Sequence, residues 1–316
     1  MQYSVVIPVY NEAGVLPTLY DRLTPVMQDL GEPYEIIFVN DGSADESPRL
    51  LRDLQVKDAH VKFLSLSRNF GHQLAITAGL DYSLGQAVVV MDADLQDPPE
   101  VIPSLVDAWR TGYDVVFAVR QQRRGEGLFK RLTAALFYRL LRRMTATEIP
   151  LDTGDFRLMS RKAVDTLKGI RERNRFLRGL SGWMGFRQTS VPFVRDVRHA
   201  GETKFPLRKM LQFALTGIVS FSFVPLKLAG YLGFLVSSVS FFYVAYAIGL
   251  KLFTDQVVQG WTSVMVAVLF LGGVQLLSLG IIGDYIGRIY EEVKQRPLYI
   301  VDEARGFDCH PPDRPQ

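Results

Sequence analysis

The sequence predicts an α/β domain with a mostly parallel, Rossmann-like sheet, followed by interfacial helices and two transmembrane helices. Over residues 1 to about 195, short β-branched runs alternate with helix-length stretches, as in a parallel sheet covered by helices on both faces. Charged residues are frequent up to Lys209, but residues 228–250 and 256–283 contain none. A soluble domain does not need two such stretches close together, so we expect this part of the chain in a membrane.

Composition excludes several classes of protein. With 316 residues, 22% charged and 48% hydrophobic, the chain is neither disordered nor, given its uncharged stretches, a purely soluble enzyme. The single cysteine, Cys309, cannot form a bridge within the chain, which excludes a disulfide scaffold and suits a reducing compartment. Residues 1–12 lack the basic segment of an export signal, so folding is expected to begin in the cytoplasm. The net charge of +3 is too small to indicate nucleic acid as a partner.

Five short apolar runs are expected to be strands, and each is followed by a stretch with apolar residues at helical spacing: 3–9, 34–40, 61–67, 87–91 and 114–119. Two helix starts are marked by local signals. Ser43 and Glu46 have the spacing of a capping box, and Asp97 precedes two prolines and Glu100 as an N-cap would.

Polar residues gather where these strands end. In open α/β sheets, ligands bind beyond the carboxyl ends of the strands. No Gly-x-Gly-x-x-Gly motif follows any of the expected strands, and no Gly-x-x-x-x-Gly-Lys motif occurs, which argues against a dinucleotide dehydrogenase and a P-loop ATPase. The polar groups are Asn11 and Glu12, then Asp41 to Ser43, then Arg68 and Asn69, then Asp92 to Asp94.

The acidic run after the fourth strand predicts a cation site. Asp92, Asp94, Gln96 and Asp97 place several oxygen ligands within six residues, and such ligands suit Mg²⁺ or Mn²⁺. Mg²⁺ takes one or two protein carboxylates and completes its shell with phosphate and water, so a nucleotide diphosphate would complete this site. The alternative is a solvated loop, with Asp97 serving only as a helix cap.

The two uncharged stretches predict a membrane hairpin. Residues 228–250 would extend roughly 35 Å as a helix, enough to cross a bilayer, and residues 262–283 give a second span. A pair of buried soluble helices is the alternative. Basic residues flank the hairpin on its outer sides, before it at Lys204, Arg208, Lys209 and Lys227 and after it at Arg288, Lys294 and Arg296. By the positive-inside rule, we expect a multi-pass protein of the inner (plasma) membrane with both termini in the cytoplasm.

Four segments follow from these patterns: an α/β domain at 1–205, an interfacial amphipathic region at 206–224, the two-helix hairpin at 225–287 and a cytoplasmic tail at 288–316. Gly283 and Gly287 form one Gly-x-x-x-Gly step, which leaves room for a homo-oligomer.

Five ordered motifs carry a resemblance over nearly the whole chain. VIPVYNE (6–12), VNDGS (39–43) and DADLQDP (92–98) resemble the signatures of family-2 inverting glycosyltransferases with the GT-A fold. DTGDFRL (152–158) and RHAGETKF (198–205) narrow the resemblance to the polyprenyl-phosphate glycosyltransferases. That group includes dolichol-phosphate mannose synthases and bacterial enzymes that charge undecaprenyl phosphate with glucose or aminoarabinose.

The resemblance implies roles for individual residues. The nucleotide sugar would contact Asp92 together with a base- and ribose-binding wall of Pro8, Tyr10, Glu12 and Asp41. Asp94 and Gln96, with Asp92 beside them, would hold Mg²⁺ or Mn²⁺ against the diphosphate. The lipid phosphate and the diphosphate would be bound by Arg120, Arg131, Arg198 and Lys204.

The implied reaction is a direct displacement at the anomeric carbon by the lipid phosphate. Asp155 would be the base or an orienting group, with Asp152 as second candidate. UDP-glucose is the first choice of donor, with GDP-mannose and UDP-linked aminoarabinose as alternatives. A processive polysaccharide synthase would need more spans and a Gln-x-x-Arg-Trp motif, and an inactive nucleotide-sugar-binding scaffold is the remaining alternative. His72 is interpreted as a structural histidine, and Trp183 as a core or interface residue.

Overall fold

The computed structural model describes residues 1–120, 153–173, 175–193, 224–253 and 260–307. The described residues divide into two compact units. The first holds a β-sheet with its covering helices and includes residues 296–307 from beyond the second unit. The second unit consists of two long helices.

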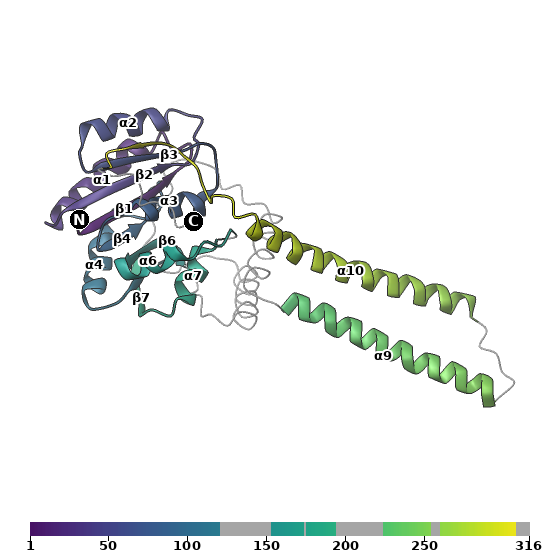
Figure 1. Cartoon of the computed structure of the whole chain (residues 1–316). Helices are drawn as coiled ribbons and strands as arrows, with labels where there is room; N and C mark the ends of the chain where they lie inside the picture. Colours follow the sequence, from purple (N-terminus) through teal and green to yellow (C-terminus); the bar gives the residue numbers. More distant parts are fainter. Residues whose placement is uncertain (121–152, 174, 194–223, 254–259, 308–316) are drawn as a thin grey trace, which may run out of the picture. The chain divides into compact units, whose positions relative to one another are not determined.

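The first unit is built on a sheet of eight strands within the described ranges, in the order β7-β5-β6-β4-β1-β2-β3-β8 (Figure 1). Neighbouring strands are parallel except at β4–β6, β5–β6 and β3–β8, so the predicted mostly parallel α/β sheet is confirmed. The strands are β1 Tyr3–Val9, β2 Tyr34–Asn40, β3 Val61–Leu66, β4 Ala87–Val90, β5 Val115–Arg120, β6 Thr153–Ser160, β7 Gln188–Phe193 and β8 Val301–Arg305.

The five strands expected from sequence all occur, and each differs by no more than one residue at either end. Three further strands were not expected. β6 has the sequence TGDFRLMS and overlaps the DTGDFRL motif, and β7 contains a proline. β8 has the sequence VDEAR, with the partial exposure of an edge strand. These strands lack the continuous apolar run of β1, which is buried along its whole length.

Helices cover both faces of the sheet, and alternate strand residues point to each face (Figure 1). On one face, α1 Leu16–Asp29, α2 Ser47–Lys57 and α4 Ile102–Arg110 pack against Val5, Phe38 and Val89. On the other face, α3 His72–Tyr82, α6 Arg161–Gly169 and α7 Leu177–Trp183 share one hydrophobic cluster with Val6, Val39 and Val90.

The predicted helix caps are wrong. The residue before α2 is Glu46, whose side chain makes no capping hydrogen bond. Asp45 serves the start of this helix instead, because its Oδ1 accepts from the backbone N–H of Ser47 at 3.0 Å. The Ser43 hydroxyl instead accepts a hydrogen bond from the backbone N–H of Asn11, which joins the loops after β1 and β2. The short 3₁₀ turn Pro99–Val101 starts after Pro98 without a side-chain cap, and Asp97 is buried.

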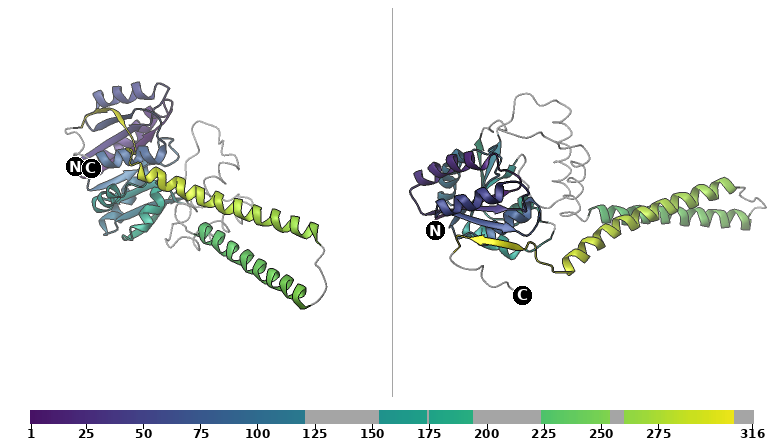
Figure 2. Two further views of the ribbon diagram at one scale, coloured as in Figure 1. Left: turned by 45° about the vertical axis from the view of Figure 1, so that its right-hand side comes forward. Right: turned by 90° about the horizontal axis from the view of Figure 1, so that it is seen from above.

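A segment from the C-terminal end of the chain completes the sheet. β8, the yellow strand in Figure 2, pairs antiparallel with β3. Glu303 of β8 forms an ion pair with Arg52 of α2 at 2.9 Å. Ahead of β8, the Tyr299 hydroxyl donates to Asp81 of α3 at 2.8 Å. The segment 288–316, expected as a tail, therefore contributes a strand to the first unit.

The second unit contains α9 Val224–Phe253 and α10 Trp261–Val293, which run side by side in both views (Figure 2). Among the described residues, one stretch, Val264–Val293, is long and apolar enough to cross a membrane by length and composition. The described apolar part of α9, Ala229–Tyr243, is shorter. Many large apolar side chains of both helices are exposed, such as Phe242 and Leu276.

The turn after β2 should not tolerate a side chain at Gly42. Gly42 has a φ of 68°, and a Cβ there would lie 2.5 Å from the backbone of Arg68 and Asn69. Gly42→Ala is expected to lower the free energy of unfolding by about 2 kcal/mol or more, because strain and overlap add. Thermal unfolding followed by circular dichroism measures the loss.

Gly14→Ala is the matched control, because a Cβ there would have no neighbour within 4 Å among the described residues. Equal losses of stability in the two variants would contradict this account of the turn.

Candidate active site

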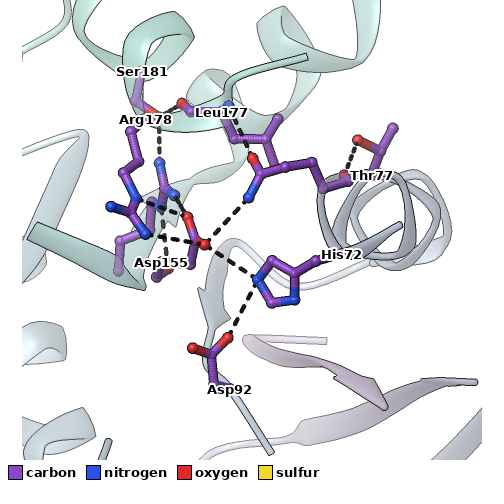
Figure 3. Close-up of polar contacts among 9 residues, drawn as sticks. His72, Thr77, Asp92, Asp155, Leu177, Arg178 and Ser181 are labelled. Carbon is purple, nitrogen blue, oxygen red and sulfur yellow. Dashed lines mark hydrogen bonds and ion pairs between the residues drawn. The ribbon is translucent and has the colours of Figure 1, made fainter. Parts of the chain in front are cut away.

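The carboxyl edge of the sheet brings together residues that are distant in sequence. β6 runs opposite to β4, and their last aligned pair is Val90 with Arg157. Asp92 lies two residues beyond this pair on the β4 side, and Asp155 lies two residues beyond it on the β6 side. Both point toward the face covered by α3 and α7, because side chains two residues apart share a face of a strand (Figure 3).

Asp155 is the centre of a network of charged and polar groups (Figure 3). Its Oδ1 lies 2.7 Å from Nη2 of Arg157 and 3.1 Å from Nε of Arg178. Its Oδ2 lies 3.1 Å from Nε2 of His72 and 3.2 Å from Nε2 of Gln73. The side chain is 6% exposed, so the network replaces water as the solvent of this carboxylate.

The pKa values follow from this arrangement. Burial alone would raise the pKa of Asp155, but the hydrogen bond with His72 and the charges of Arg157 and Arg178 hold that pKa well below its usual range. Burial lowers the pKa of Arg157 to about 10, with the charge of Asp155 opposing the shift. Burial would lower the pKa of His72, but its hydrogen bond with Asp155 and the charges of Asp92 and Asp155 raise it.

Asp92 connects this network to the predicted cation site. Its Oδ1 lies 3.4 Å from Nε2 of His72, which is longer than a hydrogen bond, and no described group donates a hydrogen bond to it. Burial raises the pKa of Asp92, and the nearby His72 charge opposes this. Asp94 lies in the following turn, where its Oδ1 accepts from the backbone N–H of Gln96 at 3.1 Å.

The carboxylates of Asp92 and Asp94 fit a Mg²⁺ ion whose remaining ligands come from a bound phosphate and water. Within the described ranges, no group of three or more His, Cys, Asp and Glu side chains is arranged to hold a metal. Mg²⁺ needs only one or two protein carboxylates when phosphate and water complete its shell. Asp92 and Asp94 lie together at the end of β4, and the buried Oδ1 of Asp92 has an unused acceptor capacity.

The predicted nucleotide wall lies at the ends of β1 and β2. Asp41 is buried, and its two oxygens accept from the backbone N–H groups of Phe70 and Gly71 at 2.7 and 2.9 Å. Burial raises its pKa, although these hydrogen bonds oppose the shift. Asp41 therefore holds the loop after β3. Tyr10 is 51% exposed, and Pro8 is buried within β1.

Of the remaining predicted site residues, two lie within the described part of the chain and four lie outside it. Glu12 is partly buried, and its backbone N–H donates to the hydroxyl of Ser47 at 3.0 Å. Arg120 ends β5, and its Cα pairs with that of Phe193. Four predicted site residues lie outside the described residues: Asp152, Arg131, Arg198 and Lys204.

Four residues of the Asp155 network were not predicted as site residues: His72, Gln73, Arg157 and Arg178. His72 was interpreted as structural, but it lies between two carboxylates. Arg157 could have been predicted from the sequence. It lies two residues after Asp155, and side chains two residues apart in a strand lie on the same face. Trp183 is not a core residue, since it is 63% exposed.

Comparison with known proteins identifies the family. The model of glycosyl transferase family 2 matches residues 4–168, and that of the GtrB C-terminal hairpin matches residues 224–289. The chain belongs to glycosyl transferase family 2. It is a glycosyltransferase, and the family resemblance of its motifs is confirmed.

Similar proteins cover nearly the full chain. The uncharacterized glycosyltransferase YkcC of Bacillus subtilis (strain 168) is 55% identical over 98% of this chain and 95% of its own length. The SfII prophage-derived bactoprenol glucosyl transferase of Shigella flexneri is 45% identical over 96% of this chain and 98% of its own. A solved mannosyltransferase from Pyrobaculum calidifontis in complex with GDP-Man and Mn²⁺ is 19% identical, with a TM-score of 0.49, and covers 69% of this chain and 63% of that chain.

The Asp155 network predicts a pH-dependent contribution to stability. Asp155→Asn is expected to cost about 3 kcal/mol at pH 7, because Arg157 keeps its buried charge without the opposite charge. The folded pKa of Asp155 is depressed, so its contribution is fully present above the unfolded pKa of about 3.9. It is lost as the pH falls through that value toward the lower folded pKa.

The difference in unfolding temperature between the wild type and Asp155→Asn should therefore be constant from pH 7 to pH 5 and shrink at pH 3. A difference that widens on acidification would show that the folded pKa of Asp155 is raised instead.

Proposed function

We propose that this glycosyltransferase transfers a sugar from a nucleotide diphosphate donor to a polyprenyl phosphate at the cytoplasmic face of the membrane, with glucose from UDP-glucose and undecaprenyl phosphate as first choices. The observation that carries the proposal is that Asp92, two residues before Asp94, meets the Asp155 network through His72 at one edge of the sheet. The names of relatives support the substrate, since several are bactoprenol glucosyl transferases.

The acceptor would supply its own nucleophile. A phosphate monoester has a second pKa of about 6, so it is already largely ionised near pH 7 and needs little help from a base. Asp155 has a low pKa and its oxygens are engaged by Arg157, Arg178 and His72. We therefore assign Asp155 an orienting role, in which it holds Arg178 beside Asp92, in preference to the role of general base.

The anionic substrates need cations from the protein. A phosphate acceptor and a diphosphate donor repel each other, and arginine forks match phosphate oxygens. Arg120, at the carboxyl end of β5, and the sequence-predicted Arg131, Arg198 and Lys204 are proposed for this role. On the donor side, Tyr10, Glu12 and Asp92 are proposed to contact the nucleotide sugar, with Asp41 and Pro8 shaping the wall around it.

Asp94 and Gln96, with Asp92 beside them, would hold Mg²⁺ or Mn²⁺. Such an ion supplies positive charge to the leaving diphosphate. The protein's own part is to keep these oxygen ligands together: Leu95 has a φ of 58°, and the bond from the Gln96 N–H to Asp94 closes the turn between them.

For the membrane part, we propose that α9 and α10 both cross the bilayer, with both chain ends in the cytoplasm and the interfacial region at 206–224. The hairpin family model over residues 224–289 and the basic flanks of this segment support the arrangement. The proposed segments are otherwise those of the sequence: 1–205 for the catalytic domain, 225–287 for the hairpin and 288–316 for the cytoplasmic C-terminal segment, which contains β8.

Transfer to lipid tests the proposal directly. Purified protein with Mg²⁺ or Mn²⁺ and undecaprenyl phosphate is offered labelled UDP-glucose, GDP-mannose and UDP-aminoarabinose in parallel. Label is expected in the organic phase from UDP-glucose. Asp94→Asn and removal of the metal by a chelator should each lower the rate by about 100-fold or more.

The matched control is Asp107→Asn, which removes an exposed carboxylate on α4 and should transfer at the wild-type rate. Normal transfer by Asp94→Asn would refute the metal assignment, and product from another donor alone would replace glucose as the sugar.

Labelling tests the membrane topology. In a Cys309→Ser background, Gly260→Cys places a thiol at the start of α10. An impermeant maleimide is expected to label it in intact cells, whereas the unaltered protein, through Cys309, should be labelled only after lysis. The reverse pattern would overturn the orientation, and labelling of both or neither thiol in intact cells would overturn the hairpin.

A further inference from the structure

Gln73 joins three elements of the active site through one side-chain amide. It is the second residue of α3, next to His72, and it reaches both Asp155 on β6 and the first residue of α7, Leu177 (Figure 3). We infer that Gln73 is a positioning residue that fixes α7, and through it Arg178, against Asp155 for sugar transfer. The inference rests on the function proposed above.

The helix that Gln73 holds has no cap of its own. α7 is seven residues long, and its N-cap residue, Phe176, provides no side-chain hydrogen bond. Helices this short are marginal without tertiary support, and their first N–H groups lack partners inside the helix. The Oε1 of Gln73 accepts from the backbone N–H of Leu177 at 3.1 Å, so α3 caps α7.

The nitrogen of the same amide contacts the carboxylate of Asp155. Nε2 of Gln73 donates to Oδ2 of Asp155 at 3.2 Å. A carboxylate only accepts and a backbone N–H only donates, so the two partners fix which way the amide faces. Glutamate in this place would set oxygen against oxygen at Asp155, and lysine could not accept from Leu177. Only an amide of this length serves both partners.

The position of Arg178 depends on this bridge. Arg178 is the second residue of α7, and its Nε and Nη2 lie 3.1 and 3.3 Å from the oxygens of Asp155. The backbone of Gln73 is itself held in place, because the Thr77 hydroxyl donates a hydrogen bond to its carbonyl oxygen at 2.8 Å. If α7 shifts, Arg178 moves relative to the reacting groups, and misplacement by about 1 Å can cost on the order of 100-fold in rate.

Two substitutions separate the two halves of the amide. Gln73→Met removes both hydrogen bonds at similar length, whereas Gln73→Glu keeps an acceptor for Leu177 and places a negative charge beside Asp155. Gln188→Met is the matched control: Gln188 also bonds α7, at the carbonyl of Ser181 at 2.7 Å, and among the described residues its amide makes no hydrogen bond to Asp155. The full chain is used, with kcat and KM for lipid-linked sugar formation and hydrogen exchange of the α7 backbone as readouts.

For Gln73→Met we expect kcat to fall about 10- to 100-fold with exchange of the first turn of α7 accelerated. For Gln73→Glu we expect a similar loss of kcat while the turn stays protected. Gln188→Met should keep kcat within twofold. A Gln73→Met enzyme with wild-type kcat, or an equal loss of kcat in Gln188→Met, would overturn the inference. Absence of transfer by the wild type would instead refute the proposed function, and the exchange data would still report whether Gln73 caps α7.

Discussion

The buried pair of Asp155 and Arg157 is the interaction on which the rest of the site depends. Arg157 is 1% exposed, and taking a guanidinium out of water costs several kcal/mol unless opposite charge and hydrogen bonds replace the water. The carboxylate of Asp155 supplies the charge, and the hydroxyl of Ser181 accepts from Nη1 at 3.0 Å. Asp155 must therefore stay ionised. The groups that contact it must in turn direct a positive charge or a hydrogen-bond donor at its two oxygens.

This constraint has a chemical consequence. A carboxylate that is stabilised by two arginines and a histidine is a weak base, and a lipid phosphate is a nucleophile that needs no strong one. The site is better described as a set of charges prepared for anionic substrates than as an acid–base pair. Two further acidic groups, Asp92 and Asp94, lie on the β4 side, where a cation and a diphosphate would be shared.

α3 links this site to a distant part of the chain. Its first turn contacts Asp92 and Asp155 through His72 and Gln73, and its last turn carries Asp81, which binds Tyr299 and Arg171. Tyr299 belongs to the segment that follows α10 and leads into β8. After the hairpin segment the chain therefore returns to α3, the helix that carries His72 and Gln73. Side-chain contacts hold α3 at its first turn and at its last turn.

The sequence by itself determined the strands that are buried on both faces, since β1 and β2 carry continuous apolar runs, and it located Asp92, Asp94 and Asp155 from motifs. It also indicated the family and the apolar hairpin segment. Tertiary structure alone decided that Asp155 lies opposite Asp92, because β6 inserts antiparallel beside β4, and that β8 is the edge strand beside β3. It alone brought His72, Gln73 and Arg178 to one carboxylate. Their spacing of up to 106 residues leaves no local pattern, because such contacts are set by the packing of α3 and α7 and not by the periodicity of either helix.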